Sequence, residues 1–276
     1  MKTEIELPEK FSEVREYLAR TQRCQLETLK KVASVLDGLG LRYYLASGTA
    51  LGAARHGGFI PWDDDVDIVM PRPDYDKFEE LIFTSHIGLK AYSWKYTPGF
   101  RLSFLKVASE NVQNLDHSPY AIDVFALDIL PKSKFVRKLQ GVVRWILMQT
   151  TIVKHGNKNG LVKKWRVPFY KFLNLFLPKD SQRVSMWIQS MMVQSGDYNQ
   201  DAIVGGRFSM YGDKEFMPFG VFGVNGGSEV EFEGAKFKAA KYLEKYLSNF
   251  FGDWRKLPPV ENRLPHHDDD PAWFWG

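Results

Sequence analysis

Cysteine and long apolar runs are nearly absent from this sequence, and each absence excludes a class of protein. Cys24 is the single cysteine among 276 residues, which excludes an intrachain disulfide and a cysteine-based zinc cluster. The longest apolar stretch, residues 142–153, is interrupted by Arg144 and is far shorter than the ~20 residues of a membrane-spanning helix. Residues 1–10 mix acidic, basic and short apolar side chains, a pattern that predicts no signal peptide. We therefore expect a cytoplasmic protein that contacts membranes at most peripherally.

An excess of charge of one sign is also missing. The formal net charge is +4, which gives general nucleic-acid binding little support, so we expect no nucleic-acid partner. Hydrophobic residues make up 44% of the chain, enough for a substantial core, and the length suits one large domain or two small ones. The sequence shows no internal repeat and no low-complexity linker.

The most informative run extends from Phe59 to Met70 and contains four aspartates. Prolines at positions 61, 71 and 73 leave little room for a helix, and the β-branched residues between them favour a strand. In an extended chain Asp63, Asp65 and Asp67 share one face, while the opposite face is apolar, with Val66, Ile68 and Met70. Like charges about 6 Å apart repel by roughly 2–3 kcal/mol per pair at an effective dielectric near 20.

A bound cation would offset this repulsion, and the hard ions Mg²⁺ or Mn²⁺ suit carboxylate oxygens best. The alternatives are a solvated acidic turn and a calcium loop. The sequence lacks the glycine and the final glutamate that an EF-hand calcium loop requires. The apolar residues that alternate with the aspartates favour a metal site over a solvated turn.

Two further segments supply candidate site residues. Asp123 lies within an apolar strand-like run, where a carboxylate needs a metal or a basic partner, and we predict that it completes the metal site. Gly48 and Thr49 follow a short strand and open a helix, so their N–H and hydroxyl groups are suited to phosphate, although an ordinary helix cap has the same pattern.

Basic residues near these segments are further candidates. Arg55, Arg101 and Lys106 are possible phosphate partners, although each alone is also a common type of surface charge. The segment His266-His267-Asp268-Asp269-Asp270 has metal-ligand composition, but its place near the end of the sequence favours a solvated tail.

The sequence predicts an α/β protein in three parts. Residues 1–132 alternate helical and strand-like segments and are expected to form a catalytic core around a small mixed sheet. Residues 133–200 are basic and aromatic and predict a helical insertion. Residues 201–276 return to strand, turn and helix patterns and are expected to complete the catalytic domain.

These segments resemble the LicD family, which includes the fukutin-type phosphotransferases and belongs to the nucleotidyltransferase superfamily. The resemblance rests on residues 47–68, SGTALGAARHGGFIPWDDDVDI, and on 70–72, MPR, and 122–125, IDVF. Weaker matches are 232–234, 251–254 and 257–259, while the basic helical region matches poorly. Ala126 departs from the family, which often has a proline there.

The resemblance implies a nucleotidyltransferase-like fold that transfers a phosphorylated alcohol, such as phosphocholine from CDP-choline, to a glycan or glycolipid hydroxyl. Lipopolysaccharide and teichoic acid are acceptors of this class. It also implies that Asp65 and Asp67 are paired ligands of Mg²⁺ or Mn²⁺, with Asp63 in or near the shell and Asp123 as the third carboxylate. Gly48 and Thr49 would hold the donor phosphates.

Two other functions use the same residues. A nucleotidyltransferase would attach the whole nucleotide to a small molecule, and a non-catalytic protein would only bind a nucleotide or glycan.

A separate expectation concerns residues 134–176, whose lysines and arginines alternate with Trp145, Trp165, Phe169, Tyr170 and Phe172. This composition suits a membrane headgroup zone, although the aromatic side chains could instead form the core of a helical subdomain.

Overall fold

The computed structural model describes residues 5–9, 11–100, 102, 104–112, 120–154, 156, 162–178, 196–206, 214 and 216–265. The helices are α1 (Phe11–Gly38), α2 (Ser47–His56), α3 (Arg72–Thr84), α4 (Lys134–Lys154), α5 (Val167–Leu173) and α7 (Leu243–Phe251). The strands are β1 (Tyr44–Leu45), β2 (Asp67–Pro71), β3 (Leu89–Tyr92), β4 (Leu105–Ser109), β5 (Ile122–Ile129), β6 (Ile203–Gly206), β7 (Met217–Pro218), β8 (Ser228–Phe232) and β9 (Ala235–Ala239). Short 3₁₀ turns are η2 (Lys164–Arg166), η4 (Phe219–Val221) and η5 (Val260–Asn262).

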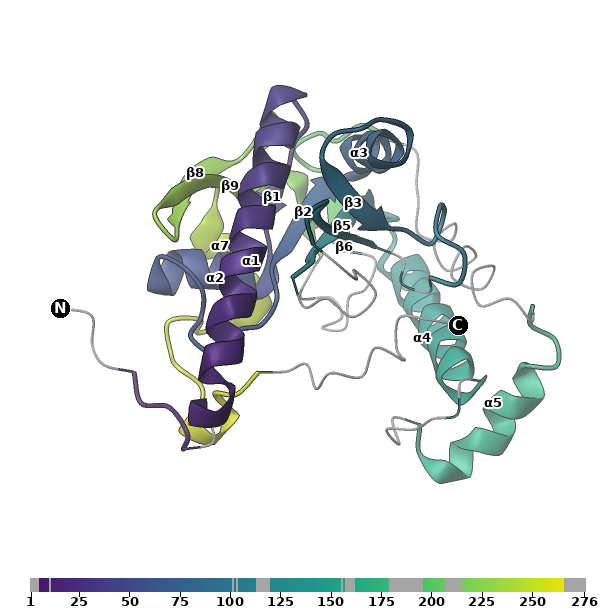
Figure 1. Cartoon of the computed structure of the whole chain (residues 1–276). Helices are drawn as coiled ribbons and strands as arrows, with labels where there is room; N and C mark the ends of the chain where they lie inside the picture. The colour runs from purple at the N-terminus through teal and green to yellow at the C-terminus, as the bar shows by residue number, and fades with distance from the viewer. Residues whose placement is uncertain are drawn as a thin grey trace.

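Within the described residues the strands form one mixed sheet flanked by helices, as the sequence predicts (Figure 1). Its order is β3-β4-β5-β2-β1-β9-β8, and β6 pairs with the later part of β5 and with β7. The pairs β2–β5 and β1–β9 are parallel, and the other pairs are antiparallel. Because β9 pairs with β1, strands from residues 201–276 join the same sheet as the early strands, while the division into three domains stays a prediction.

The apolar residues that follow the aspartates form the core of this sheet. Val66, Ile68 and Met70 are fully buried, as the alternating pattern predicts. They pack in one cluster with apolar residues of α1 such as Leu29 and Val32, which recur at helical spacing along that helix. The β2 segment is therefore held on one side by hydrophobic packing, and this fixes where its polar face points.

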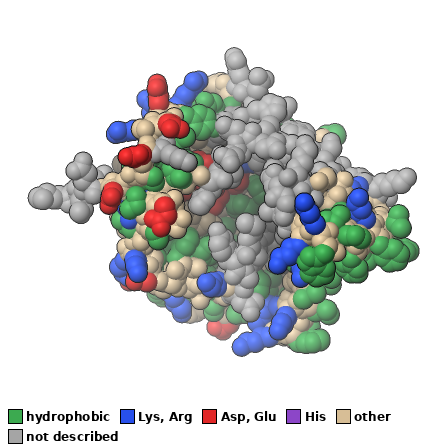
Figure 2. Space-filling view, turned by 90° about the horizontal axis from the view of Figure 1, so that it is seen from below, with side chains coloured by type: hydrophobic (Ala, Val, Ile, Leu, Met, Phe, Trp, Pro, Cys, Tyr) green, Lys and Arg blue, Asp and Glu red, His purple; other side chains and the backbone are tan. Residues whose placement is uncertain are grey.

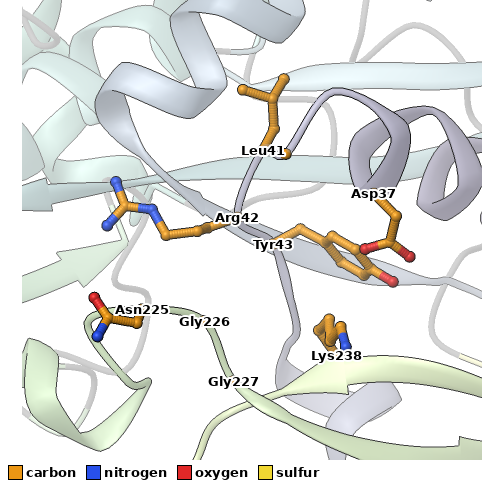
Figure 3. A pocket seen from close by; sticks show the side chains of 9 residues that line it. Asp37, Leu41, Arg42, Tyr43, Asn225, Gly226, Gly227 and Lys238 are labelled. Atoms are coloured by element: carbon orange, nitrogen blue, oxygen red, sulfur yellow. The ribbon is translucent and has the colours of Figure 1, made fainter.

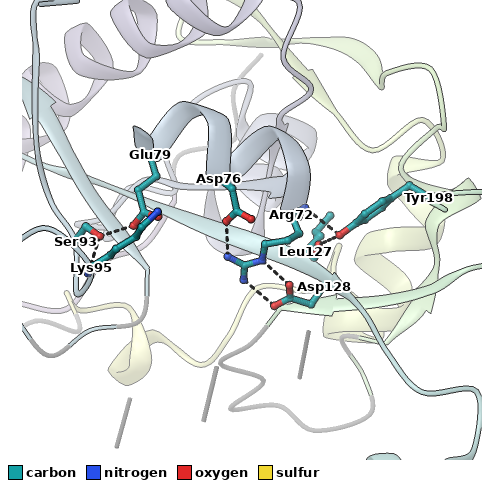
Figure 4. Close-up of polar contacts among 8 residues, drawn as sticks. All are labelled: Arg72, Asp76, Glu79, Ser93, Lys95, Leu127, Asp128 and Tyr198. Atoms are coloured by element: carbon teal, nitrogen blue, oxygen red, sulfur yellow. Dashed lines mark hydrogen bonds and ion pairs between the residues drawn. The ribbon is translucent and has the colours of Figure 1, made fainter. Parts of the chain in front are cut away.

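The end of β2 is fixed by a buried ion pair (Figure 4). Arg72 donates to both carboxylate oxygens of Asp128, at 2.6 and 2.9 Å, and Asp128 is 1% exposed. Arg72 also pairs with Asp76 at 3.2 Å, and its backbone N–H donates to the hydroxyl of Tyr198 at 3.0 Å. That hydroxyl donates in turn to the carbonyl of Leu127 at 2.6 Å. This network links the start of α3 to β5 and keeps β2 and β5 in register.

Candidate active site

Asp67 and Asp123 lie side by side at the beginning of two parallel strands. The β2–β5 register pairs Asp67 with Asp123, and the Asp123 N–H donates to the carbonyl of Val66 at 2.8 Å. Residues paired across neighbouring strands point to the same face of a sheet, so both carboxylates project from the face opposite Ile68. The structure thus brings together the two carboxylates that the sequence placed in one site, although their role as metal ligands stays a prediction.

Asp63, Asp64 and Asp65 lie in the segment that leads into β2. One carboxylate oxygen from each lies within 4.8 Å of the other two, a spacing that suits a metal ion. Side chains of α1 hold this segment, because Gln22 donates to the Asp63 carbonyl and Gln25 to the Asp64 carbonyl, each at 2.8 Å. We call these three residues the acidic triad.

The strand prediction is wrong at this point, because β2 begins at Asp67 and not at Asp63. Residues 63–66 have no regular secondary structure, and Asp64 joins its neighbours although a two-residue period assigns it to the opposite face. Sequence reasoning therefore missed Asp64, which is 8% exposed. The only sequence signal for it was its position between Asp63 and Asp65.

Burial and mutual repulsion raise the pKa of two carboxyl groups in this site. Burial is the main cause that raises the pKa of Asp63 well above its ordinary value, and the charges of Asp65 and Asp64 add to the effect. Burial also raises the pKa of Asp67 well above its ordinary value, with further contributions from Asp65, Asp123 and Asp63. Removing these carboxylates from water is unfavourable without a positive charge, so the site favours either protons or a cation.

Two cationic side chains approach the carboxylates, and each also has a protein partner. Lys106, which the β4–β5 register pairs with Asp123, contacts that carboxylate at 2.7 Å. Arg55 lowers the pKa of Asp63, and its guanidinium donates to the carbonyls of Trp254 at 2.9 Å and Lys256 at 3.3 Å. Their predicted contacts with phosphate stay predictions. Arg101 and the 266–270 segment lie outside the described residues.

The Ser47-Gly48-Thr49 turn holds Asp67 through both its main chain and its side chain. The Thr49 hydroxyl is buried and accepts a hydrogen bond from the Asp67 N–H at 2.8 Å. Ser47 hydrogen-bonds the Asp67 carboxyl group and thereby lowers its pKa, which opposes the larger effect of burial. Helix α2 begins at Ser47, so the N-cap position is held by Ala46, which makes no side-chain cap hydrogen bond. Ser47 is therefore not an ordinary N-cap serine.

Ser47 itself has a strained backbone, with φ of 45°, a value that residues other than glycine seldom adopt. Its N–H donates to the hydroxyl of Tyr246 in α7 at 3.0 Å, and Tyr246 is 4% exposed. No sequence pattern predicts a role for Tyr246, because it lies almost 200 residues away and only the folded chain brings α7 to this turn.

Gly48 is expected to tolerate no side chain. A Cβ atom at Gly48 would lie 2.7 Å from Oδ2 of Asp63, so Gly48→Ala must displace that carboxylate. We expect turnover or apparent Mg²⁺ affinity to fall by about 10- to 100-fold, as for other changes that misplace a ligand. Gly141→Ala in α4 is the matched control, because a Cβ there meets nothing within 4 Å. A folded Gly48→Ala protein whose turnover and response to divalent ions match those of the wild type would contradict this placement of Asp63.

A polar pocket at the other end of β1 lies apart from these carboxylates. It is lined by the segment 40–43, the turn 225–227, Asp37 and Lys238 (Figure 3). Ala46, at the far end of β1, is the residue whose N–H donates to the Asp67 carbonyl, at 3.0 Å. The pocket and the acidic residues therefore occupy opposite ends of one strand.

Comparison with known proteins identifies a family and several relatives. Residues 40–127 match the family described as LicD/FKTN/FKRP, nucleotidyltransferase domain, and this range includes the acidic triad, Asp67 and Asp123. The chain is 29% identical over 263 residues to the lipopolysaccharide cholinephosphotransferase LicD of Haemophilus influenzae. The matched region covers 91% of this chain and 96% of that protein.

Shorter similarities reach more distant proteins. The ribitol 5-phosphate transferase FKRP of Homo sapiens is 48% identical over 59 residues, which are 21% of this chain and 12% of that protein. A protein of Rickettsia typhi, the uncharacterized protein RT0683, is 38% identical over 56 residues, which are 20% of this chain and 18% of that protein.

Proposed function

We propose that this chain, whose residues 40–127 match the LicD family and which is 29% identical to the LicD cholinephosphotransferase, is a LicD-type phosphotransferase that transfers a phosphorylated alcohol from a CDP-linked donor to a glycan hydroxyl. Phosphocholine is the first candidate for the transferred group, since the relative that covers nearly the whole chain is a cholinephosphotransferase. Ribitol phosphate is the second, because FKRP is a ribitol 5-phosphate transferase. The acceptor is a glycan or glycolipid.

The observation that carries this proposal is the acidic triad beside the paired Asp67 and Asp123. Three carboxylate oxygens within 4.8 Å, together with the raised pKa values of Asp63 and Asp67, fit a divalent cation such as Mg²⁺ or Mn²⁺. Asp63, Asp65 and Asp67 would hold the ion, and Asp64 is a further candidate ligand. When bound, such an ion neutralises charge on the donor diphosphate.

The chain's own residues would then position the reacting groups. We assign to Asp123 the task of orienting the acceptor hydroxyl and accepting its proton, while Lys106 holds that carboxylate in place at 2.7 Å. The acceptor oxygen attacks the phosphorus that bears the alcohol, the bond from this phosphorus to the bridging oxygen breaks, and CMP leaves. The α2 turn supports this arrangement, because Thr49 fixes the backbone of Asp67.

A panel of CDP-alcohols with Mg²⁺ and a glycan acceptor tests the proposal. We expect CMP release that requires the acceptor, stops when the ion is chelated, and is fastest with CDP-choline or CDP-ribitol. Acceptor carrying a cytidylate group would instead indicate nucleotidyl transfer. Tight, ion-dependent donor binding without any product would indicate a non-catalytic binding protein.

Removal of divalent ions is expected to destabilise the protein, and more so at about pH 7.5 than at about pH 5. The pKa values of Asp63 and Asp67 are raised in the folded state, so the ion-free native state binds more protons than the unfolded state. The contribution of these two groups to its stability is greatest below the ordinary Asp pKa and falls as the pH rises through the raised values. A bound cation replaces these protons, so the gain in Tm on adding Mg²⁺ should grow with pH.

Thermal melts with Mg²⁺ or with EDTA at the two pH values measure this effect. The variant Asp63→Asn/Asp67→Asn is the comparison, and it should show little change in Tm on adding Mg²⁺. An equal Mg²⁺ effect in wild type and variant would place the ion elsewhere.

A further inference from the structure

Helices α4 and α5, with η2 between them, form a unit that extends away from the sheet (Figure 1). We call the described residues 134–154 and 162–178 the α4–α5 unit. It has small cores of its own, in which Val153, Val162 and Tyr170 pack together and Leu147 packs with neighbours, and none of these residues belongs to the main core cluster of the sheet. The unit is therefore a separate layer attached to the catalytic body.

Many of its large apolar side chains face solvent. Trp165 is 72% exposed, Leu175 77% and Phe176 72%. Of the five aromatic residues that the sequence singled out in this region, only Tyr170 is buried. The alternative that these aromatic side chains form the subdomain's core is therefore wrong for the others. Exposed apolar groups gathered in this way mark a surface that binds a partner.

The same unit carries charge of one sign. Between Asp128 and Asp180 the sequence has twelve lysines and arginines and no acidic residue. Lys163, Lys164 and Lys171 are exposed beside the exposed aromatic residues. Figure 2, a view from below, shows hydrophobic and basic side chains gathered on the right of the molecule, over this unit, while most acidic side chains in view lie toward the left.

We propose that the α4–α5 unit binds the surface of a membrane rich in anionic phospholipid. Lysine and arginine complement anionic headgroups, while tryptophan and phenylalanine enter the boundary between headgroups and acyl chains. No helix among the described residues is long and apolar enough to cross a membrane, so this contact is peripheral. A second copy of the chain fits less well, because two such basic faces repel each other.

This inference goes beyond the proposed function, and vesicle binding needs no turnover, so either can fail alone. The test is sedimentation of the full chain with vesicles of phosphatidylglycerol and phosphatidylcholine, at low and at high salt. We expect binding to the vesicles that contain phosphatidylglycerol, little binding to pure phosphatidylcholine, and weaker binding at high salt. Failure to bind phosphatidylglycerol vesicles at low salt would overturn the proposal.

Two variants separate the contributions of charge and apolar contact. Lys163→Glu/Lys164→Glu should weaken partition onto the anionic vesicles by about 30-fold or more. Trp165→Ser/Phe176→Ser should weaken it at high salt as well, because the contacts that remain in screened solution are apolar. These side chains are exposed, so circular dichroism and melting should match the wild type.

The matched control for charge is Lys236→Glu/Lys245→Glu, at exposed lysines of the β8–β9 hairpin and of α7. Each double variant lowers the formal net charge from +4 by four, to zero. The control should bind vesicles more tightly than Lys163→Glu/Lys164→Glu. An equal loss of vesicle binding in both double variants would show that net charge alone governs binding and would overturn the assignment to this unit. Self-association of the wild type through these same exposed residues would also overturn it.

Discussion

Asp67→Asn is expected to lower turnover by about 1,000-fold or more, about 4 kcal/mol of transition-state stabilisation, while the protein stays folded. Asparagine keeps the size of the side chain but removes the charge that would hold a divalent ion. Burial and the neighbouring carboxylates raise the pKa of Asp67, so its ionised form is unfavourable in the ion-free protein. The same substitution should therefore raise Tm when the ion is chelated.

Initial rates at saturating donor and Mg²⁺, together with melts in EDTA, measure both effects. Asp201→Asn is the matched control, since Asp201 is exposed in a surface turn and the substitution should change neither quantity. A folded Asp67→Asn protein that retains most of its activity at ordinary Mg²⁺ concentration would remove Asp67 from the catalytic machinery.

Arg72→Met is expected to lower the free energy of unfolding by about 3–5 kcal/mol, because it removes the opposite charge that Arg72 places against a buried carboxylate. Asp128 is 1% exposed and would lose the two hydrogen bonds that it receives from Arg72. Methionine preserves much of the aliphatic volume, which limits the loss from packing. Urea denaturation at neutral pH measures the change.

Arg255→Met is the matched control for this prediction. Arg255 pairs with Glu244 at 2.6 Å, but both side chains are mostly exposed, so the cost should be about 0–1 kcal/mol. The double variant Arg72→Met/Asp128→Leu removes both charges and should regain much of the lost stability. Equal destabilisation by Arg72→Met and Arg255→Met would mean that burial does not govern the strength of the Arg72 pair.

The sequence predicts the local elements around the site well. The helix after Ser47 and the apolar strand around Asp123 both occur where the sequence predicts them, because each has strong periodicity or a clear end signal. The apolar side of β2 is also as expected, because Val66, Ile68 and Met70 are buried, as their alternation with the aspartates predicts. These features depend on neighbours within a few residues.

The strand pairings and distant contacts that form the site are not visible in the sequence. The parallel pairing of β2 and β5 sets Asp67 beside Asp123, and no local pattern specifies it, although the sequence predicts that the two carboxylates share a site. Gln22 and Gln25 of α1 hold the acidic triad in a segment without regular secondary structure, where propensity predicts a strand. The hydroxyl of Thr49 is an acceptor for the Asp67 N–H, a task that a cap motif does not reveal.

The mass of the acceptor after reaction tests the central claim most directly. Purified protein is incubated with CDP-choline, Mg²⁺ and a defined oligosaccharide acceptor, and the mass of the acceptor is then measured by mass spectrometry. Our account predicts that the acceptor gains one phosphocholine group while an equal amount of CMP appears, and that neither forms with Asp67→Asn. An acceptor that gains a cytidylate group, or phosphocholine transfer that persists in Asp67→Asn, would contradict it.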